Sequence, residues 1–151
     1  MIDRASIRAL TDGKGAGGNI TVDASESVEI NGRGVFAQLT TQTFFEGDAG
    51  TIAVRTGKLV LRDGGQITSS TLGRGNGGTV TVNASQSVEA SGRGEFKGEV
   101  FRSGLLAQSA GSLFRVLGKE GNISVNTGRL VVRDGATLSV SSIERNQDVP
   151  S

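Results

Sequence analysis

The segment GKLVLRDGGQITSST (residues 57–71) is closely repeated as GRLVVRDGATLSVSS (residues 128–142), 71 positions further along the chain. Both copies place alternating hydrophobic residues before Arg-Asp-Gly and a second short run of β-branched and hydroxyl residues after it. Alternation at period two is typical of a β-strand, and Asp-Gly is typical of a tight turn. The pair therefore predicts a strand, a turn and a second strand, written twice.

A second repeat alternates with the first. GNITVDASESVEINGRG (18–34) and GTVTVNASQSVEASGRG (78–94) are identical at 11 of 17 positions and define the A units. GTIAVRTGKLVLRDG (50–64) and GNISVNTGRLVVRDG (121–135) define the B units. The order along the chain is A-B-A-B, and repeats of this length are typical of solenoid proteins.

Short hydrophobic triplets recur within each unit about every eight residues, separated by Gly, Asn, Asp and Ser. Three short strands per unit predict an all-β fold, a parallel β-helix with three faces and about four coils, over residues 1–142. Residues 143–151 form a polar C-terminal tail. The interior columns predicted by this spacing are Ile20, Ile52, Val80 and Ile123; Val28, Leu59, Val88 and Leu130; and Phe36, Ile67, Leu106 and Leu138.

The composition limits what the chain can do. Among 151 residues there are 24 Gly and six Phe, and no Cys, His, Trp or Tyr, so a narrow core of small aliphatic side chains is expected. A net charge of +1 provides no field that would attract nucleic acid or an anionic membrane, and we expect neither as a partner. No apolar run has the length of a signal peptide or of a membrane span.

Several motifs suggest chemistry but have a simpler structural explanation. Arg62-Asp63-Gly64 and Arg133-Asp134-Gly135 have the order of a turn, not that of the cell-binding Arg-Gly-Asp tripeptide. The Gly-rich segments 13–18 and 73–78 precede β triplets, whereas a phosphate-binding loop leads into a helix. They are therefore expected to be turns between coils.

The acidic residues offer one alternative to be tested. Glu29 and Glu89 occupy the same outward position in the two A units, where they could act as acid and base, bind a cation, or simply be solvated. Val60 and Val131 hold that position in the B units, which favours solvated side chains. The positions after the first triplet hold Asp23, Arg55, Asn83 and Asn126. They lack the paired acids or the His of a polysaccharide-processing site, so we predict no enzyme, no catalytic residue, no cofactor and no metal.

All six Phe residues lie in or beside the segments that interrupt the repeat. Because loops on a rigid scaffold often carry binding, Phe44, Phe45, Phe96 and Phe101 are candidates for one aromatic interaction patch. The alternative is that these rings cover the core and pack on each other.

The phrases GNITVDASESVEI, GTVTVNASQSVEA and TGRLVVRDGATLSVSS, with LLAQ at 105–108, resemble the repetitive region of filamentous-haemagglutinin-like large exoproteins of Gram-negative bacteria. The resemblance implies a right-handed β-helical shaft, exported by two-partner secretion through an outer-membrane transporter and then secreted or displayed on the cell surface, often as an adhesin. The Asn-Pro-Asn-Gly motif of the family's secretion domain is absent, since the single proline is Pro150. The sequence therefore resembles an internal or C-terminal piece of such a shaft.

The expected function is a structural shaft segment without chemistry of its own. The alternative is a carbohydrate-binding or polysaccharide-processing β-helix. Expected partners are a host or neighbouring-cell surface, with glycans as candidates, and the transporter during export. Because a stack of parallel strands has open edges, the isolated chain is also expected to associate end to end.

Overall fold

The computed structural model of the protein describes residues 2–3, 6–33, 37–110, 119 and 121–143. They form strands and loops, and the described residues include no helix. The strands are β1 (Ile2–Asp3), β2 (Ser6–Thr11), β3 (Ile20–Asp23), β4 (Ser27–Asn31), β5 (Gln38–Thr43), β6 (Thr51–Arg62), β7 (Gln66–Thr71), β8 (Thr79–Ser91), β9 (Arg93–Phe96), β10 (Glu99–Arg102), β11 (Gly104–Ala110), β12 (Asn122–Thr127), β13 (Leu130–Arg133) and β14 (Thr137–Ile143).

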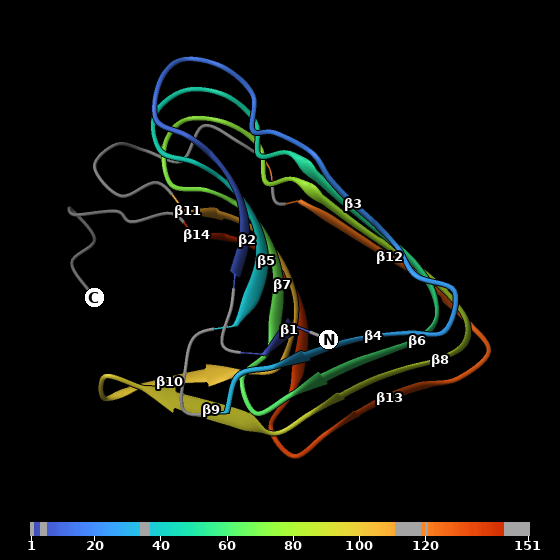
Figure 1. Ribbon diagram of the computed structural model, residues 1–151. Coiled ribbons are helices and arrows are strands. Elements are labelled where there is room, and N and C mark those ends of the chain that lie inside the picture. Colours follow the sequence, from blue (N-terminus) through green and yellow to red (C-terminus); the bar gives the residue numbers. More distant parts are fainter. Residues whose placement is uncertain (1, 4–5, 34–36, 111–118, 120, 144–151) are drawn as a thin grey trace.

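Two parallel sheets make up most of the fold (Figure 1). The larger has seven strands, in the order β1-β4-β6-β8-β12, with β3 paired to β6 and β13 paired to β8. The smaller has five strands, in the order β14-β11-β7-β5-β2, and β9 and β10 form a separate antiparallel hairpin. Neither parallel sheet closes on itself. The prediction of an all-β protein with parallel strands is confirmed.

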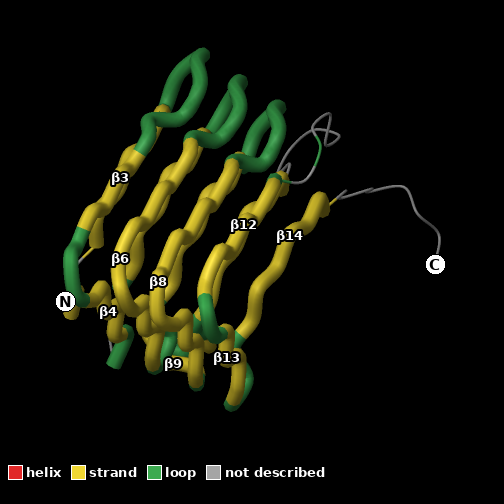
Figure 2. The backbone as a smooth tube through the Cα atoms, turned by 90° about the vertical axis from the view of Figure 1, so that its right-hand side faces the viewer, coloured by secondary structure: helices red, strands yellow, loops and turns green. Residues whose placement is uncertain are grey.

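The seven-stranded sheet is bent, and the five-stranded sheet lies across the space between its two arms (Figure 1). The bend falls where the register between β6 and β8 shifts, between Thr56 and Lys58. An extra residue in one of two paired strands bends the pair, which explains how single strands can contribute to both arms. Figure 2 shows that successive segments of the chain lie beside one another along a common direction.

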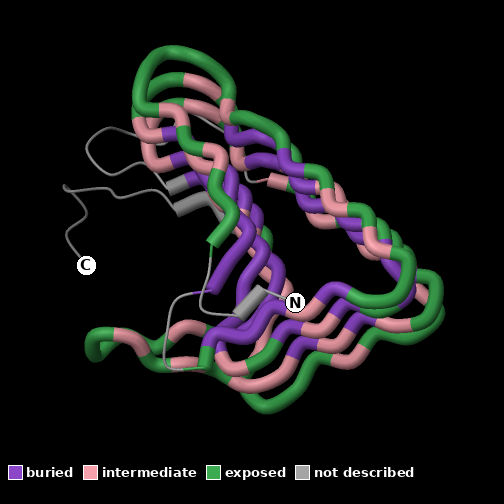
Figure 3. The backbone as a smooth tube through the Cα atoms, in the orientation of Figure 1, coloured by how far each residue is buried: buried purple, intermediate pink, exposed green. Residues whose placement is uncertain are grey.

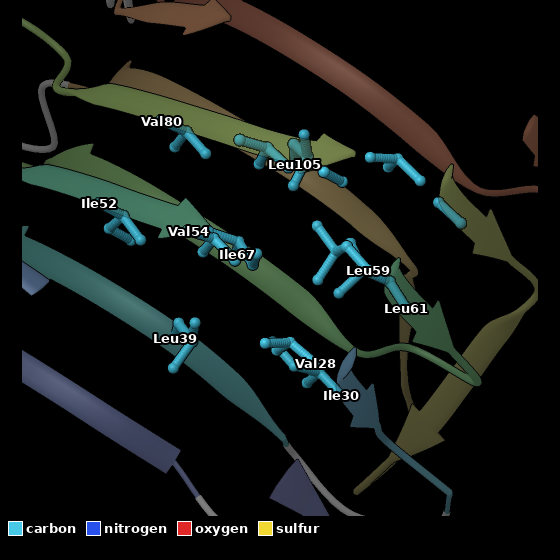
Figure 4. Packing of buried hydrophobic residues seen from close by; sticks show 14 of the residues in the cluster. Val28, Ile30, Leu39, Ile52, Val54, Leu59, Leu61, Ile67, Val80 and Leu105 are labelled. Atoms are coloured by element: carbon cyan, nitrogen blue, oxygen red, sulfur yellow. The ribbon is translucent and has the colours of Figure 1, made fainter. Parts of the chain in front are cut away.

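Equivalent residues of successive units pair in register, and we call each such set a row. Ile20, Ile52, Val80 and Ile123 form one row, and Val28, Leu59, Val88 and Leu130 form another. Both rows were predicted from the triplets, and the register confirms that their members pair; the prediction that all of them are interior is wrong for Leu130, which is 48% exposed. Their central members are fully buried, and Figure 4 shows their side chains directed into a common core. Figure 3 shows the buried positions along the strands and the exposed ones mainly in the corner loops.

The predicted third row is wrong at two of its four positions. The row consists of Ile7, Leu39, Ile67, Leu105 and Leu138. Leu39 takes the place predicted for Phe36, because six residues separate β4 from β5, and Phe36 itself lies outside the described residues. Leu105 takes the place of Leu106, because strand alternation buries only one of two adjacent leucines and Gly104 pairs with Gln66.

The interior of the five-stranded sheet also holds hydroxyl groups, which the expectation of an aliphatic core did not include. Thr41 Oγ1 donates to Ser69 Oγ at 2.9 Å, and Ser69 Oγ donates to the Gly50 carbonyl oxygen at 2.6 Å. Both side chains are fully buried. Their mutual hydrogen bonds compensate the loss of water, and they join this sheet to the loop that precedes β6.

Both Asp-Gly turns are confirmed. Gly65 N donates to Arg62 O at 2.8 Å, with positive φ angles of 50° at Asp63 and 91° at Gly64. Asp134 and Gly135 repeat this geometry, with φ angles of 54° and 86°. Two successive positive φ angles favour Gly and Asp at these positions.

The first Asp-Gly turn lies within a stack of glycines. A Cβ on Gly64 would lie 2.8 Å from Gly94 N, and one on Gly32 would lie 2.7 Å from Asp63 O. We call Gly32, Gly64 and Gly94 the glycine stack. Strand β14 extends to Ile143, and the remaining residues of the predicted tail, 144–151, lie outside the described part of the chain.

Candidate functional site

The four candidate Phe residues do not form one patch. Phe44 and Phe45 follow β5, whereas Phe96 and Phe101 lie in the β9–β10 hairpin that precedes β11. β5 and β11 both pair in parallel with β7, so the C-terminal end of β5 and the N-terminal end of β11 lie at opposite ends of these strands (Figure 1). A strand of six residues separates its two ends by about 20 Å. The prediction of a single aromatic patch is therefore wrong.

The structure brings two of the four rings together. Phe96 and Phe101 line an open depression of about 640 Å³ with Ser6, Arg8, Lys97 and Glu99. Lys97 Nζ lies 5.3 Å from the centre of the Phe96 ring, a cation-π distance. No described Phe belongs to the hydrophobic core cluster, so the alternative in which these rings cover the core is not supported either.

A row of polar side chains runs along the corner between the two arms of the seven-stranded sheet. We call it the corner row, and it consists of Asp23, Arg55, Asn83 and Asn126. All four residues are exposed. Within the described part of the chain, none of these side chains makes a hydrogen bond or an ion pair with another residue. A carboxylate, a guanidinium and two amides are thus presented to solvent side by side.

The corner row borders two adjoining surface depressions of about 320 and 390 Å³. The depressions share Arg55, Thr56 and Ser85 and therefore adjoin, and we call the two together the corner groove. Its lining residues beyond the corner row and these shared residues are Ala24, Ser25, Gly57, Ala84, Thr127 and Gly128. Small side chains at the bend leave the groove open, and the longer side chains of the corner row border it.

The two glutamates of the A units do not meet. Val60 pairs with both Glu29 and Glu89, so a whole strand separates the two carboxylates. Glu89 instead accepts a hydrogen bond from Arg133 Nη2 at 2.8 Å. Among the described residues there is no group of three or more His, Cys, Asp or Glu that could hold a metal ion. This geometry favours solvated side chains over an acid-base pair.

The two Gly-rich loops form backbone hydrogen bonds with the loop that lies between them, residues 44–50. Gly15 N donates to Glu46 O at 3.0 Å, and Gly47 N donates to Arg74 O at 2.9 Å. The loops at 13–18 and 73–78 lead into strands β3 and β8. A phosphate-binding loop would leave its N–H groups free at the start of a helix, and these loops do not.

The sequence analysis considered the four corner-row residues only as a catalytic site, and found that they lack the residues that catalysis requires. It did not predict the groove beside them. The available signal was the small residues after each first triplet, Ala24-Ser25 and Ala84-Ser85 in the A units. No signal predicted that Ser6 and Arg8 would lie beside Phe96, because about 90 residues separate them in the sequence.

Comparisons with protein-family models, curated proteins and solved structures find no match to this chain. In the part of the chain that the structure describes, no helical segment has the length and apolarity of a membrane span.

Proposed function

We propose that the chain is a segment of a right-handed parallel β-helix, and that it serves as a structural shaft in a secreted or surface-displayed bacterial exoprotein of the filamentous-haemagglutinin type. The observation that carries this proposal is the pairing of equivalent residues from four successive units in one row, as in Ile20, Ile52, Val80 and Ile123. Where each unit contacts only its neighbours, a protein lengthens by adding units. A shaft needs that property.

The path of the chain supports the β-helical assignment. The chain passes along one arm of the bent sheet, then the other arm, then the five-stranded sheet, as in β3, β4 and β5. It repeats this order through β6 and β7, through β8 and β11, and through β12, β13 and β14. Each passage adds one strand to every side. Three sides visited in a fixed order are what a three-faced β-helix requires.

The proposed role requires no catalysis, cofactor or metal. The alternative of a polysaccharide-processing β-helix would need two suitably spaced carboxylates beside the substrate. Among the described residues that line the corner groove, Asp23 is the single acidic one. The groove thus favours binding over bond cleavage.

Surface labelling tests the shaft proposal. An epitope inserted after Lys97, at the tip of the exposed β9–β10 hairpin, should be stained by antibody on intact cells of the encoding bacterium and should be removed by external protease. An outer-membrane transporter would be required, so deleting its gene should abolish the staining. Staining that appears only after permeabilisation would contradict the proposal.

A deletion tests the repeat architecture independently. Removing residues 20–79 takes out one A and one B unit and joins Asn19 to Val80, which occupies the row position of Ile20. Because every row is preserved, the shortened chain should keep the far-ultraviolet circular dichroism of a β protein and should unfold cooperatively. Loss of both would show that the units do not stack independently.

A further inference from the structure

We infer that the corner groove binds a neutral, extended polysaccharide that lies along the corner row, across successive strands. This inference goes beyond the proposed shaft, because it gives one side of the protein a ligand. It rests on the corner row, on the hollow beside it and on the balance of charge around them.

The hydrogen-bonding groups of the corner row suit sugar hydroxyls. A carboxylate accepts, a guanidinium donates in a planar fork, and a carboxamide does both. Neighbouring hydroxyls of a sugar ring are donors and acceptors, so such planar groups can bind them in pairs. Because none of the four side chains is engaged within the described part of the chain, a ligand would not have to displace an existing contact.

The spacing of the corner row favours a chain over a single sugar. Neighbouring parallel strands lie about 4.8 Å apart, so Asp23, Arg55, Asn83 and Asn126 repeat at that interval. The rise per sugar in an extended β-1,4-linked chain is close to this interval, which lets consecutive sugars meet consecutive side chains. A coiled α-1,4-linked chain would leave the row after one or two sugars.

The charge and the lining argue against two other classes of ligand, a polyanion and an amphipathic helix. Asp23 and Arg55 are adjacent and of opposite sign, so the groove has no net attraction for a polyanion. Ala24, Ala84 and Gly128 form a lining without large apolar side chains, which an amphipathic helix would need. Among the described residues no aromatic ring lines the groove, so we expect weak binding, with a Kd of roughly 1 mM.

Nuclear magnetic resonance titration of the full chain with cellohexaose tests this inference. Backbone amide shifts should change at 23–25, 55–57, 83–85 and 126–128, and maltohexaose should bind at least about tenfold more weakly. Arg55→Ala should weaken cellohexaose binding roughly five- to tenfold. The matched control is Arg62→Ala, because Arg62 is also an exposed arginine of β6 but lies outside the groove. Asn126→Ala should weaken binding to a similar degree, since it removes the contact at the far end of the row.

Several results would overturn the inference. These are an absence of shifts at about ten times the expected Kd, shifts centred elsewhere, equal effects of Arg55→Ala and Arg62→Ala, or equal binding of both hexasaccharides. A response to a sulfated hexasaccharide alone would also overturn it, because it would indicate a polyanion site. None of these outcomes bears on surface labelling or on the deletion, so the shaft proposal is tested separately.

Discussion

Replacing Gly64 by Ala tests whether the glycine stack sets the distance between neighbouring strands. Gly64 has a φ of 91°, and a Cβ there would lie 2.8 Å from Gly94 N and 3.1 Å from Phe101 O. Gly135 occupies the equivalent place in the second Asp-Gly turn, with a φ of 86°, and the nearest neighbour of a Cβ there would be Arg93 Cδ, in a flexible side chain, at 3.9 Å. The two substitutions share backbone strain, and only Gly64→Ala adds a collision with backbone.

The magnitudes follow from this difference. Placing a Cβ at a left-handed φ costs roughly 1–2 kcal/mol, and the stiffer unfolded chain offsets about 0.4–1 kcal/mol of that cost. Gly135→Ala should therefore destabilise by about 1 kcal/mol. Displacing packed backbone adds roughly 1–3 kcal/mol, so Gly64→Ala should destabilise by about 2–4 kcal/mol. For a chain of this size these values lower the Tm by roughly 2–4 °C and 5–15 °C.

Thermal and urea unfolding followed by far-ultraviolet circular dichroism measure both effects. Leu138→Ala controls for the location of Gly135 near the C-terminal end of the described chain, because Leu138 packs against the core in the same segment. Its destabilisation would show that this segment unfolds together with the rest of the protein. If Leu138→Ala is destabilising and the two glycine substitutions cost the same, the argument from the glycine stack is refuted.

Three further predictions concern the rows and the surface. Leu59→Ala should destabilise by about 2–5 kcal/mol and Leu130→Ala by less than half as much, because Leu59 is fully buried and Leu130, in the same row, is 48% exposed; equal values in urea unfolding would contradict this. Glu89→Gln should cost only about 0.2–1 kcal/mol, since the partner side chain, Arg133, is 59% exposed, and a double-mutant cycle should show the coupling vanish at high salt. The purified chain should associate end to end with rising concentration, and Ile7→Lys or Leu130→Lys should reduce this association in sedimentation velocity, whereas a monomer at every concentration would argue against open edges.

The sequence was sufficient to predict the rows of the seven-stranded sheet. Each triplet places hydrophobic residues at alternate positions, so burying one member also buries the other, as for Ile52 and Val54. The five-stranded sheet was harder, because its interior includes Thr41 and Ser69, whose hydrogen bonds replace hydrophobic contacts. A pattern of apolar residues cannot reveal hydroxyl groups that are buried in pairs.

The candidate site was predicted less well. Phe44 and Phe96 both lie where the repeat is interrupted. The sequence does not show that the first interruption follows strand β5, whereas the second precedes strand β11 of the same sheet. The corner groove depends on small residues at a bend whose position is set by a register shift. The shift itself is visible in the hydrophobic spacing, because Ile52 and Leu59 are seven residues apart whereas Val80 and Val88 are eight apart. The spacing does not show where between the two triplets the extra residue lies, or that small side chains leave a groove there.

The alternation of A and B units also has an electrostatic consequence. In the row of Glu29, Val60, Glu89 and Val131, each acidic residue is followed by a neutral one. Two glutamates on adjacent strands would repel by about 0.9 kcal/mol at 4.8 Å in water, and this falls by half at twice that distance, where salt screening adds to the reduction. A protein made of A units alone would carry this repulsion at every step, whereas each B unit places a neutral side chain between the glutamates of successive A units and so weakens their repulsion.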